Sequence, residues 1–533
     1  MRLRRKLSKV GLLLTSSAVL SMAFACGALA APRSFATENK VAIYASGSYS
    51  NWDGVTNVAQ FKGADGVLCY AIDADDHVTV YRTKEGKTLS DTITLKKQHP
   101  IFGTVICDGN GNFYLVTGEA NSTDETNVET VFISKYDSNG NHIKTTGDNG
   151  SSSLAWYYNE SFYTKNPFHG GNCDAAIHDN ILTVNYARKM YSGHQSNSVF
   201  SVNLDDMSKV NVGAFYESHS FAQRVVPTAE GFVYMSEGDC YERAFTFYSV
   251  KLTDGSCTFS QEQKTFDFWV KDGALDEYNM YVVNENFAHM GGLAALTNGN
   301  VAFVAQSAQS LSSNASSESE EIFIQIFNPY ADLSSAESYV TTGERSGLAG
   351  NNGRTNVTNY GVKWLTAYGS GTKIANVQIA ASQKDEIVVL YECSEGYNYK
   401  GVYYMILDAE GNITTPATCF SATAKLNPCE MPVFTDGCVT WVGNQYGDSE
   451  NRIYIYSLNM SGEKSGVLSG DVNGDKVVDR ADRMYLARYL AGWTNYSLVD
   501  ESAADLNEDG IVNRGDRIYL ARYLAGWEGY CLD

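Results

Sequence analysis

The stretch FGTVICDGNGNFYLVTG (102–118) is two strand-like runs joined by a tight turn, and units of this kind recur along most of the chain. Apolar residues flank the turn DGNGN, whose Asp, Asn and Gly residues favour the backbone angles of hairpin turns. Seven such units lie at 66–83, 102–118, 172–186, 224–236, 292–306, 378–392 and 431–443. Further strand-like segments that complete several units lie at 131–143, 321–328, 401–413 and 452–459.

Seven hairpin units in succession predict a mainly β chain and a seven-bladed β-propeller-like module, in which each blade is a four-stranded sheet around a central channel. The early run VAIYAS (41–46) is expected to close the ring by pairing with the last blade. The Ser-rich run AQSAQSLSSNASSESEE (305–321) is expected to be a solvated connection between blades. A stack of β-sandwiches is the alternative architecture.

The turns DGNGN, DSNGN, TNGN and DAEGN also invite a calcium-binding interpretation. The hairpin interpretation is favoured, because Asp/Asn-Gly supplies the positive φ that hairpins need and no further acidic ligands follow each turn.

The first 30 residues have the pattern of a secretory signal peptide. A basic start, MRLRRKLSK, precedes an apolar run that ends at Ala28-Leu29-Ala30, an A-x-A cleavage pattern. A retained membrane helix is less favoured because Thr, Ser and Gly interrupt the run, and a lipid anchor at Cys26 is less favoured because AFAC is a poor lipobox. No other apolar stretch is long enough to span a bilayer, so we expect a secreted, extracellular protein without membrane insertion.

Composition and motifs exclude several classes of function. The net charge of −21 disfavours nucleic acid and anionic membranes as partners. The 11 cysteines are irregularly spaced and form no metal-binding pattern. An oxidising compartment would permit disulfides between them, but their spacing does not predict any particular pair. No G-x-S-x-G, H-E-x-x-H or P-loop pattern occurs, which disfavours serine hydrolases, zincins and nucleotide-dependent enzymes.

The C-terminal part contains one sequence motif twice, as GDVNGDKVVDRADRMYLARYLAGW (470–493) and ADLNEDGIVNRGDRIYLARYLAGW (504–527). Calcium takes six or more oxygen ligands, which a 12-residue loop supplies from positions 1, 3, 5, 7, 9 and 12. The two copies therefore predict two calcium ions. The predicted ligands are Asp471, Asn473, Asp475, the Val477 carbonyl, Asp479 and Asp482 in the first loop, and Asp505, Asn507, Asp509, the Ile511 carbonyl, Asn513 and Asp516 in the second.

Each loop runs directly into one predicted helix, 482–493 or 516–527. The first carries an apolar stripe and a helix stop at Gly492. The stripe comprises Tyr485, Leu486, Tyr489, Leu490 and Trp493, and the second copy repeats it with Tyr519, Leu520, Tyr523, Leu524 and Trp527. At position 8 of the loops, Val478 and Val512 are expected to pack inward between the paired loops.

This duplicated loop-and-helix arrangement closely resembles a type I dockerin, the calcium-dependent module that docks secreted polysaccharide-degrading proteins onto cohesin modules of a cellulosome or related scaffold. From this resemblance and the patterns above, the chain is expected to have four parts: a signal peptide (1–30), the propeller-like module (31–462), a linker (463–469) and a small helical dockerin (470–533), the last implied by the resemblance. The resemblance also implies a cohesin of a scaffold or cell-surface protein as partner, with calcium supplying part of the folding free energy of the small domain.

The family's cohesin-contact positions fall on Arg480, Ala481, Ala487 and Arg488 in the first copy, and on Arg514, Gly515, Ala521 and Arg522 in the second. The two sets are nearly identical, so the resemblance implies that either helix can face the cohesin. Their Arg-Ala and Arg-Gly pairs depart from the Ser-Thr pair of one well-known group, which leaves the cohesin type open. For Arg488 and Arg522, solvated charge on a helix face is the alternative interpretation.

Position 6 of such a loop normally requires Gly, which Gly510 provides in the second copy, whereas the first has Lys476. A non-Gly residue there costs about 1 kcal/mol. We therefore expect weaker calcium binding by the first loop and tighter binding after Lys476→Gly. Equal affinities of the two loops in calorimetry would contradict this expectation.

The function of the large module stays open between a glycoside hydrolase or polysaccharide lyase and a non-catalytic module that binds a glycan or a protein. Polar and aromatic residues crowd into 155–243, where a ligand site at the channel mouth is predicted. Its candidate residues are His169, Arg188, His194, His219, Arg224, Glu237, Asp239 and Arg243. Trp156, Tyr157, Tyr158 and Tyr163 form a candidate sugar-stacking platform. The alternative is that the tyrosines pack between blades and the His and Arg side chains satisfy buried polar groups.

Overall fold

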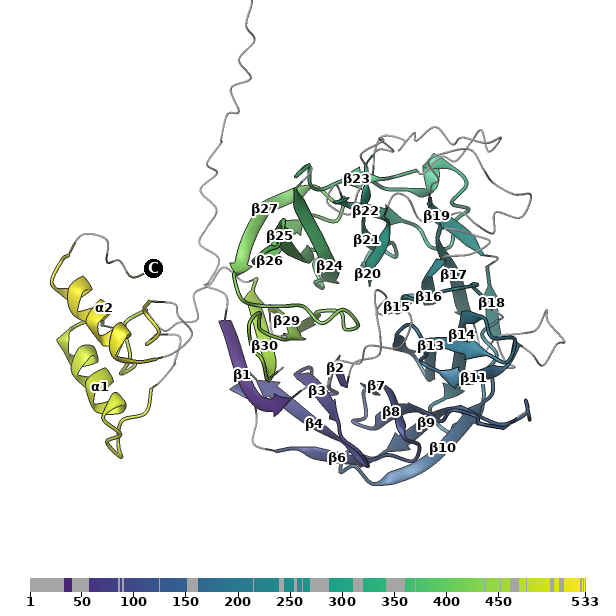
Figure 1. Ribbon diagram of the computed structural model, residues 1–533, viewed down its shortest axis with the longest axis horizontal. Helices are drawn as coiled ribbons and strands as arrows, with labels where there is room; N and C mark the ends of the chain where they lie inside the picture. The colour runs from purple at the N-terminus through teal and green to yellow at the C-terminus, as the bar shows by residue number, and fades with distance from the viewer. Residues whose placement is uncertain are drawn as a thin grey trace, which may run out of the picture.

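A ring of seven antiparallel sheets forms the larger part of the computed structural model (Figure 1). The structure describes residues 33–40, 57–84, 87–88, 91–123, 125–150, 162–213, 215–238, 244–253, 256–260, 262–268, 287–309, 320–341, 360–369, 371–435, 437–450, 452–460, 469–475, 477–498, 503–507, 512–527, 530 and 532. The predicted signal peptide therefore lies outside the described residues. The seven-bladed β-propeller is confirmed, and the alternative of stacked sandwiches is wrong.

The blades follow one another along the chain, and the first strand of most blades lies nearest the channel. Blades 1 and 2 comprise β2 (Val58–Lys62), β3 (Leu68–Asp73), β4 (His77–Lys84), β5 (Lys87–Thr88) and β6 (Ile93–Lys96), then β7 (Ile101–Cys107), β8 (Phe113–Gly118), β9 (Val131–Tyr136) and β10 (His142–Asp148). Blades 3 and 4 comprise β11 (Thr164–Pro167), β12 (Cys173–His178), β13 (Ile181–Met190) and β14 (Gln195–Asn203), then β15 (Gln223–Thr228), β16 (Gly231–Gly238), β17 (Ala244–Thr253), β18 (Ser256–Phe259) and β19 (Gln263–Asp267).

Blades 5 and 6 comprise β20 (His289–Ala295), β21 (Val301–Ala308), β22 (Glu320–Phe327) and β23 (Lys363–Trp364), then β24 (Thr372–Ala381), β25 (Ile387–Glu395), β26 (Asn398–Leu407) and β27 (Ile413–Ser421). Blade 7 comprises β28 (Val433–Thr435), β29 (Cys438–Gly443), β30 (Arg452–Asn459) and β1 (Arg33–Lys40).

The ring closes through β1, which pairs antiparallel with β30 and puts Ser34 opposite Tyr456. An N-terminal strand thus completes the C-terminal blade, as expected, but the strand is 33–40, and the predicted segment 41–46 lies outside the described residues. Five of the seven predicted hairpins are the first two strands of a blade, and the hairpin 172–186 is β12 and β13, the second and third strands of blade 3. The first, 66–83, is instead the second hairpin of blade 1, because the preceding β2 is a short run of five residues that the sequence pattern did not reveal.

The Asp-rich turns are hairpin turns held by their own side chains, as predicted. Between β7 and β8, Asp108 Oδ1 accepts hydrogen bonds from the backbone N–H groups of Asn110 and Asn112, at 2.9 and 2.8 Å. Gly111 has a φ of 82°, which a residue with a side chain adopts only with strain. Asp137 repeats this arrangement between β9 and β10. The acidic side chains of these turns therefore stabilise the hairpins.

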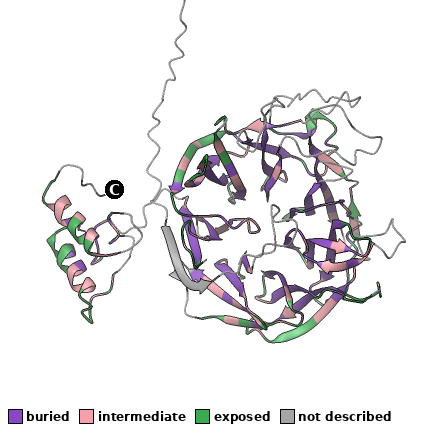
Figure 2. Ribbon diagram, viewed as in Figure 1, coloured by how far each residue is buried: buried purple, intermediate pink, exposed green. Residues whose placement is uncertain are grey.

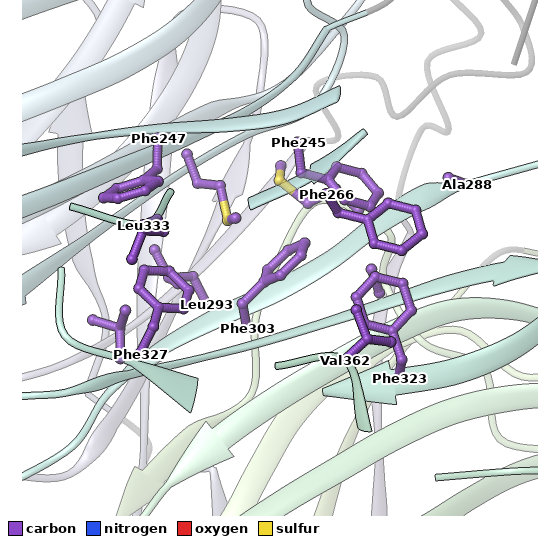
Figure 3. Packing of buried hydrophobic residues seen from close by; sticks show 14 of the residues in the cluster. Phe245, Phe247, Phe266, Ala288, Leu293, Phe303, Phe323, Phe327, Leu333 and Val362 are labelled. Atoms are coloured by element: carbon purple, nitrogen blue, oxygen red, sulfur yellow. The ribbon is translucent and has the colours of Figure 1, made fainter. Parts of the chain in front are cut away.

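The core consists of packed interfaces between neighbouring blades, so buried residues line both faces of most inner strands (Figure 2). The largest cluster joins blades 4 and 5 (Figure 3). Phe323 of β22 is fully buried there, with its ring centroid 4.6 Å from that of Phe266 and 5.3 Å from that of Trp364. These contacts fix the relative position of two blades that also contribute to the channel.

We expect Phe323→Ala to lower the free energy of unfolding by about 3–5 kcal/mol, because it removes a buried aromatic ring and leaves a cavity between two sheets. Denaturant unfolding of the full-length protein measures the change. Phe259→Ala is the matched control, since Phe259 of β18 is 49 % exposed and should change stability much less. An equal loss in both variants would contradict the assignment of Phe323 to the core.

Two helices, α1 (Arg480–Leu490) and α2 (Arg514–Leu524), follow the ring in sequence. Each begins two residues earlier than predicted, because Asp479 and Asn513 act as N-caps in reciprocal capping boxes with Asp482 and Asp516.

No helix in the described part of the chain is long and apolar enough to cross a membrane. Seven cysteines described there are free thiols, namely Cys69, Cys107, Cys173, Cys257, Cys393, Cys419 and Cys438.

Candidate functional site

One cavity of about 230 Å³ opens where the innermost strands of blades 4, 5 and 6 begin. We call it the channel pocket. Because neighbouring strands run antiparallel, the ends of β16 and β21 and the start of β22 lie at the same end of the ring and add side chains to it. Its walls are formed by Ala222, Arg224, Glu237, His289, Met290, Gln306, Glu320, Lys373, Ile374, Ala375, Asn376, Val377 and Pro428.

Glu237 and His289 face each other across the boundary between blades 4 and 5. Glu237 is 2 % exposed, and its Oε2 accepts a hydrogen bond from the Met290 N–H at 2.8 Å. Its Oε1 lies 3.8 Å from His289 Nδ1. Partial burial of the imidazole ring is the main cause that lowers the pKa of His289 to about 4, and the positive charge of Lys373 acts in the same direction. His289 is therefore neutral at neutral pH and can accept as well as donate a hydrogen bond.

Glu320 supplies a second buried carboxyl group to the channel pocket. It is 2 % exposed, and Gln306 Nε2 donates a hydrogen bond to its Oε2 and another to the Ile374 carbonyl, the latter at 3.3 Å. Burial raises the pKa of Glu320 to about 8, although Gln306 and the charge of Lys373 act in the opposite direction. At neutral pH this carboxyl group is largely protonated and can donate a proton.

A second polar cluster adjoins the channel pocket through Arg224, which interacts electrostatically with Asp174 and Glu430. Arg224 Nη2 donates to the Pro428 carbonyl at 3.3 Å, and Asp174 Oδ2 accepts from the Val225 N–H at 2.8 Å. Burial is the main cause that raises the pKa of Glu430 to about 8, and it also raises the pKa of Asp174. The channel therefore holds carboxyl groups that stay protonated well above their usual range.

Of the predicted site residues within the described ranges, Arg224 and Glu237 line the channel pocket and the others do not. Arg188 is fully buried inside blade 3, where Nε donates to Ser196 Oγ at 2.9 Å and Nη1 to Thr164 Oγ1 at 3.2 Å. The alternative interpretation, that these cations satisfy buried polar groups, therefore describes Arg188 better. Asp239, Arg243, Trp156, Tyr157 and Tyr158 lie outside the described residues, and Tyr163 is not part of the pocket wall.

The three predicted histidines form a separate group at the connections around blade 3. His194 Nδ1 lies 3.2 Å from His219 Nε2, and their rings stack with centroids 5.3 Å apart. His169 Nδ1 lies 3.1 Å from Gln195 Nε2. Burial and the charge of Lys189 lower the pKa of His169. None of the three lines the channel pocket.

Sequence reasoning missed the residues that blades 5 and 6 contribute, namely His289, Gln306, Glu320 and Lys373. The prediction that 305–321 is a solvated connection is wrong at both ends, since Gln306 belongs to β21 and Glu320 begins β22, and both are buried. The serine-rich composition of this segment suggested exposure to solvent. Gln306 and Glu320 are nevertheless buried, because strands of other blades pack around them in the assembled ring. A signal was available in the position of Glu320 directly before the apolar strand EIFIQIF.

At their described residues, the two predicted calcium loops share one set of hydrogen bonds to the aspartate at position 12. Asp482 is fully buried, and its Oδ1 accepts from the N–H groups of Val472 and Asn473, at 3.0 and 3.3 Å, while its Oδ2 accepts from Asp479 at 2.8 Å. Asp516 repeats these bonds in the second loop with Leu506, Asn507 and Asn513, at 2.8, 3.2 and 2.7 Å. The position-12 carboxylate thus anchors each loop to its helix.

The first loop gathers several carboxylates around the buried side chain of Asp482. Burial, followed by the charges of Asp471 and Asp475, raises the pKa of Asp482. Asp471 is 1 % exposed, and its Oδ1 accepts from the N–H groups of Gly474 and Asp475 at 2.8 and 3.1 Å. The oxygen donors fit a hard cation, although no group of three or more His, Cys, Asp or Glu side chains converges on one point within the described residues. Asp509, Ile511 and Lys476 lie outside those residues.

The arginines at the predicted cohesin-contact positions 488 and 522 are held between two aromatic rings. The Arg488 guanidinium lies 5.5 Å from the Trp493 ring centroid and 5.1 Å from that of Tyr496. In the second copy, Arg522 lies 5.3 Å from Trp527 and 5.1 Å from Tyr530. Each arginine also donates from Nη1 to the hydroxyl of its tyrosine. The other predicted contact residues lie on the same helices and are accessible or half-buried.

Trp493 and Trp527 do not extend the apolar stripe into the small core as predicted, since each is 58 % exposed. The reason is the helix stop. Gly492 has a φ of 73°, and the Trp493 N–H turns back to the Arg488 carbonyl at 3.1 Å, which directs the indole over Arg488. The core is smaller, built on Val472, Leu486 and Ala504, with Val512 packed against it as predicted.

Residues 469–525 match the family model of the dockerin type I domain. The chain is therefore a seven-bladed β-propeller with a C-terminal type I dockerin domain, in which the two helices are α1 and α2. Type I dockerin domains bind calcium, and their partner is a cohesin module. The match covers only the C-terminal part and leaves the propeller unassigned.

No curated protein matches the chain significantly. Among solved structures, an α-L-arabinanase from Penicillium chrysogenum has 10 % identity and a TM-score of 0.36, with 80 % of this chain and 99 % of that chain covered. The WD40 domain of a coronin from Toxoplasma gondii has 9 % identity and a TM-score of 0.38, with 85 % and 90 % covered. A sialidase from Trypanosoma rangeli has 11 % identity and a TM-score of 0.34, with 65 % and 54 % covered. These likenesses are too distant to bear on function.

Proposed function

We propose that this is a secreted protein that docks calcium-dependently onto a cohesin scaffold and takes part in polysaccharide degradation. The observation that carries the docking role is the match of residues 469–525 to the dockerin type I domain, together with two helices that begin in the same way. A protein delivered in this way acts where the scaffold is held, outside the cell.

We further propose that the dockerin binds two calcium ions, one in each loop. The first is held by Asp471, Asn473, Asp475, the Val477 carbonyl, Asp479 and Asp482. The second is held by Asp505, Asn507, Asp509, the Ile511 carbonyl, Asn513 and Asp516. The equivalent backbone bonds of Asp482 and Asp516 support this assignment, because they place both position-12 carboxylates in the same relation to their loops.

For the propeller, the channel pocket is the proposed carbohydrate site. Glycosidic bond cleavage requires a carboxylic acid that protonates the leaving oxygen and a carboxylate on the other side of the bond. Glu320, which burial keeps protonated, suits the first role, and Glu237 is the carboxyl group available for the second. His289, Gln306 and Lys373 can bind sugar hydroxyls. A non-catalytic propeller that only binds glycan in this pocket is the alternative.

The test incubates the full-length protein with xylan, arabinan, polygalacturonate, laminarin and mixed-linkage β-glucan, and records depletion of protein from solution and release of product together. Released saccharides establish an enzyme, and an unsaturated end absorbing in the ultraviolet identifies β-elimination rather than hydrolysis. Depletion without product establishes a binding module. Neither signal on any polysaccharide would contradict the carbohydrate role while leaving cohesin docking intact.

If either helix can face the cohesin, the two arginine clusters should substitute for each other. We expect the single variants Arg488→Ala and Arg522→Ala each to change the affinity for a cohesin by less than about threefold, because the other helix can still bind. The double variant should lower the affinity by about 10- to 100-fold, because arginines held in place at an interface often contribute much of the binding energy. Calorimetric titration measures the affinities. The control is Arg483→Ala with Arg517→Ala, exposed arginines of the same helices outside the predicted contact set. A full loss from one single variant would show that only one helix docks.

A further inference from the structure

The connection between β27 and β28 enters the channel and is held there from several sides. Gln378 of blade 6 donates to the Asn427 carbonyl at 2.5 Å, and Arg224 of blade 4 donates to the Pro428 carbonyl at 3.3 Å. Gln60 of blade 1 donates from its side chain to the Met431 carbonyl. Figure 1 shows a green loop beside β29 that reaches the middle of the ring. We call residues 427–431 the channel plug.

The plug is built into the ring rather than laid on its surface. The Gln60 N–H donates to Glu430 Oε2 at 2.8 Å, and Gln60 Oε1 accepts from the Val442 N–H at 2.7 Å. Met431 lies so close to Gly292 of blade 5 that a Cβ there would stand 2.6 Å from its sulfur. Blades 1, 4, 5 and 6 thus all contact the plug, which spans the channel between opposite sides of the ring.

Pro428 of the plug is also part of the wall of the channel pocket, next to Arg224. Two other residues of the wall reach solvent, since Lys373 is exposed and the side chain of His289 is 44 % exposed. The pocket is therefore open at the rim and closed toward the channel axis. Its volume of about 230 Å³ lies below the range typical of pockets for drug-sized ligands, and suits one or two sugar rings rather than a chain passing through.

We infer that the channel pocket receives the end of a saccharide chain, with the channel plug as the wall that stops it. This inference rests on the proposed function and specifies its substrate as chain termini. Recognition there is by hydrogen bonds between sugar hydroxyls and Glu237, Gln306, Glu320 and Asn376, because no Phe, Tyr or Trp side chain lines the pocket among the described residues. A chain that continued in both directions would have to pass through the plug.

The experiment uses the full-length protein and the polysaccharides of the panel above, each supplied intact and as fragments of decreasing length at equal mass. Chain-end recognition predicts that products are mono- or disaccharides from the earliest time points, with little loss of viscosity. If the module only binds, the protein bound per mass of polysaccharide should rise in proportion to the number of chain ends. A ladder of long products with a rapid fall in viscosity, or binding independent of the number of ends, would overturn the inference and leave the proposed function standing. No product and no binding would overturn both.

A pocket-filling variant tests the location. Ala375 is half-buried in the pocket wall, and Ala375→Trp should lower product release or chain-end binding at least tenfold. Ala417→Trp, on the exposed edge strand β27, is the matched control and should have no effect. Both variants should keep the thermal unfolding temperature of the unmodified protein to within a few degrees. If Ala375→Trp unfolds, Ala375→Leu is measured in its place. Unchanged chain-end activity in a folded Ala375 variant would refute the assignment.

Discussion

Removal of calcium from the full-length protein is expected to abolish cohesin binding and to unfold the dockerin domain without unfolding the propeller. Within the described residues, the buried apolar side chains of the two loops and helices are few, namely Val472, Leu486, Ala503, Ala504, Leu506 and Leu520. So small a core cannot fold on apolar burial alone. Without the ion, Asp471, Asp475 and Asp482 repel one another in the first loop. Metal binding therefore contributes directly to the folding free energy.

The size of the effect follows from mass action, since a site held at a hundred times its dissociation constant stabilises a fold by about 2.7 kcal/mol. Two such sites give about 5 kcal/mol. Calorimetry with and without a calcium chelator should show one transition lost and the propeller transition unchanged, and added calcium should restore binding. Asp482→Asn with Asp516→Asn should reproduce the loss at saturating calcium. Asp137→Asn is the control, because Asp137 is an exposed turn residue far in sequence from the loops, and an amide oxygen can still accept its two backbone hydrogen bonds. Undiminished cohesin binding in the chelator would contradict calcium-dependent docking.

Glu320→Gln is expected to abolish the activity of the propeller while stabilising the protein at alkaline pH. If Glu320 protonates the leaving group, replacing it by an amide should lower product release about 10²- to 10⁴-fold. Glu321→Gln is the matched control, since Glu321 is the next residue of β22 and equally buried, but its carboxylate accepts from the Gly369 N–H instead of lining the pocket. Equal loss of activity in both variants would contradict the role of Glu320.

The stability effect has a defined pH window. The folded-state pKa of Glu320 is raised from 4.5 to about 8, so below about pH 4.5 the side chain is protonated in both states and costs nothing. Between pH 4.5 and 8 the Glu320 carboxyl group ionises in the unfolded chain but stays protonated in the folded protein. The free energy of unfolding therefore falls with rising pH in this range. Glu320→Gln lacks this dependence and should be more stable than the unmodified protein at pH 8, by up to about 5 kcal/mol. A gain that does not grow between pH 5 and pH 8 would contradict a buried, protonated Glu320.

Local patterns determined the architecture of this protein and the nature of its C-terminal domain. Hairpin turns such as DGNGN are fixed by the Asp108 side chain and by Gly111, which are neighbours in sequence, and each blade is a set of such hairpins. The proposed calcium ligands of one loop lie within 12 residues, so their spacing suggests the chemistry without knowledge of the tertiary structure. The exact closing strand was missed, because pairing of β1 with β30 joins residues more than 400 positions apart.

The tertiary structure alone decided which polar residues share a site. Glu237, His289, Glu320 and Lys373 come from β16, β20, the start of β22 and β24, on three blades that meet only when the ring closes. The sequence pattern favoured 155–243, where histidines and arginines are dense, but packing buried Arg188 within a blade and left the histidines at its edge. The protonation of Glu320 and the position of the channel plug depend on burial by distant strands, and burial is a property of the assembled ring rather than of any segment of the chain.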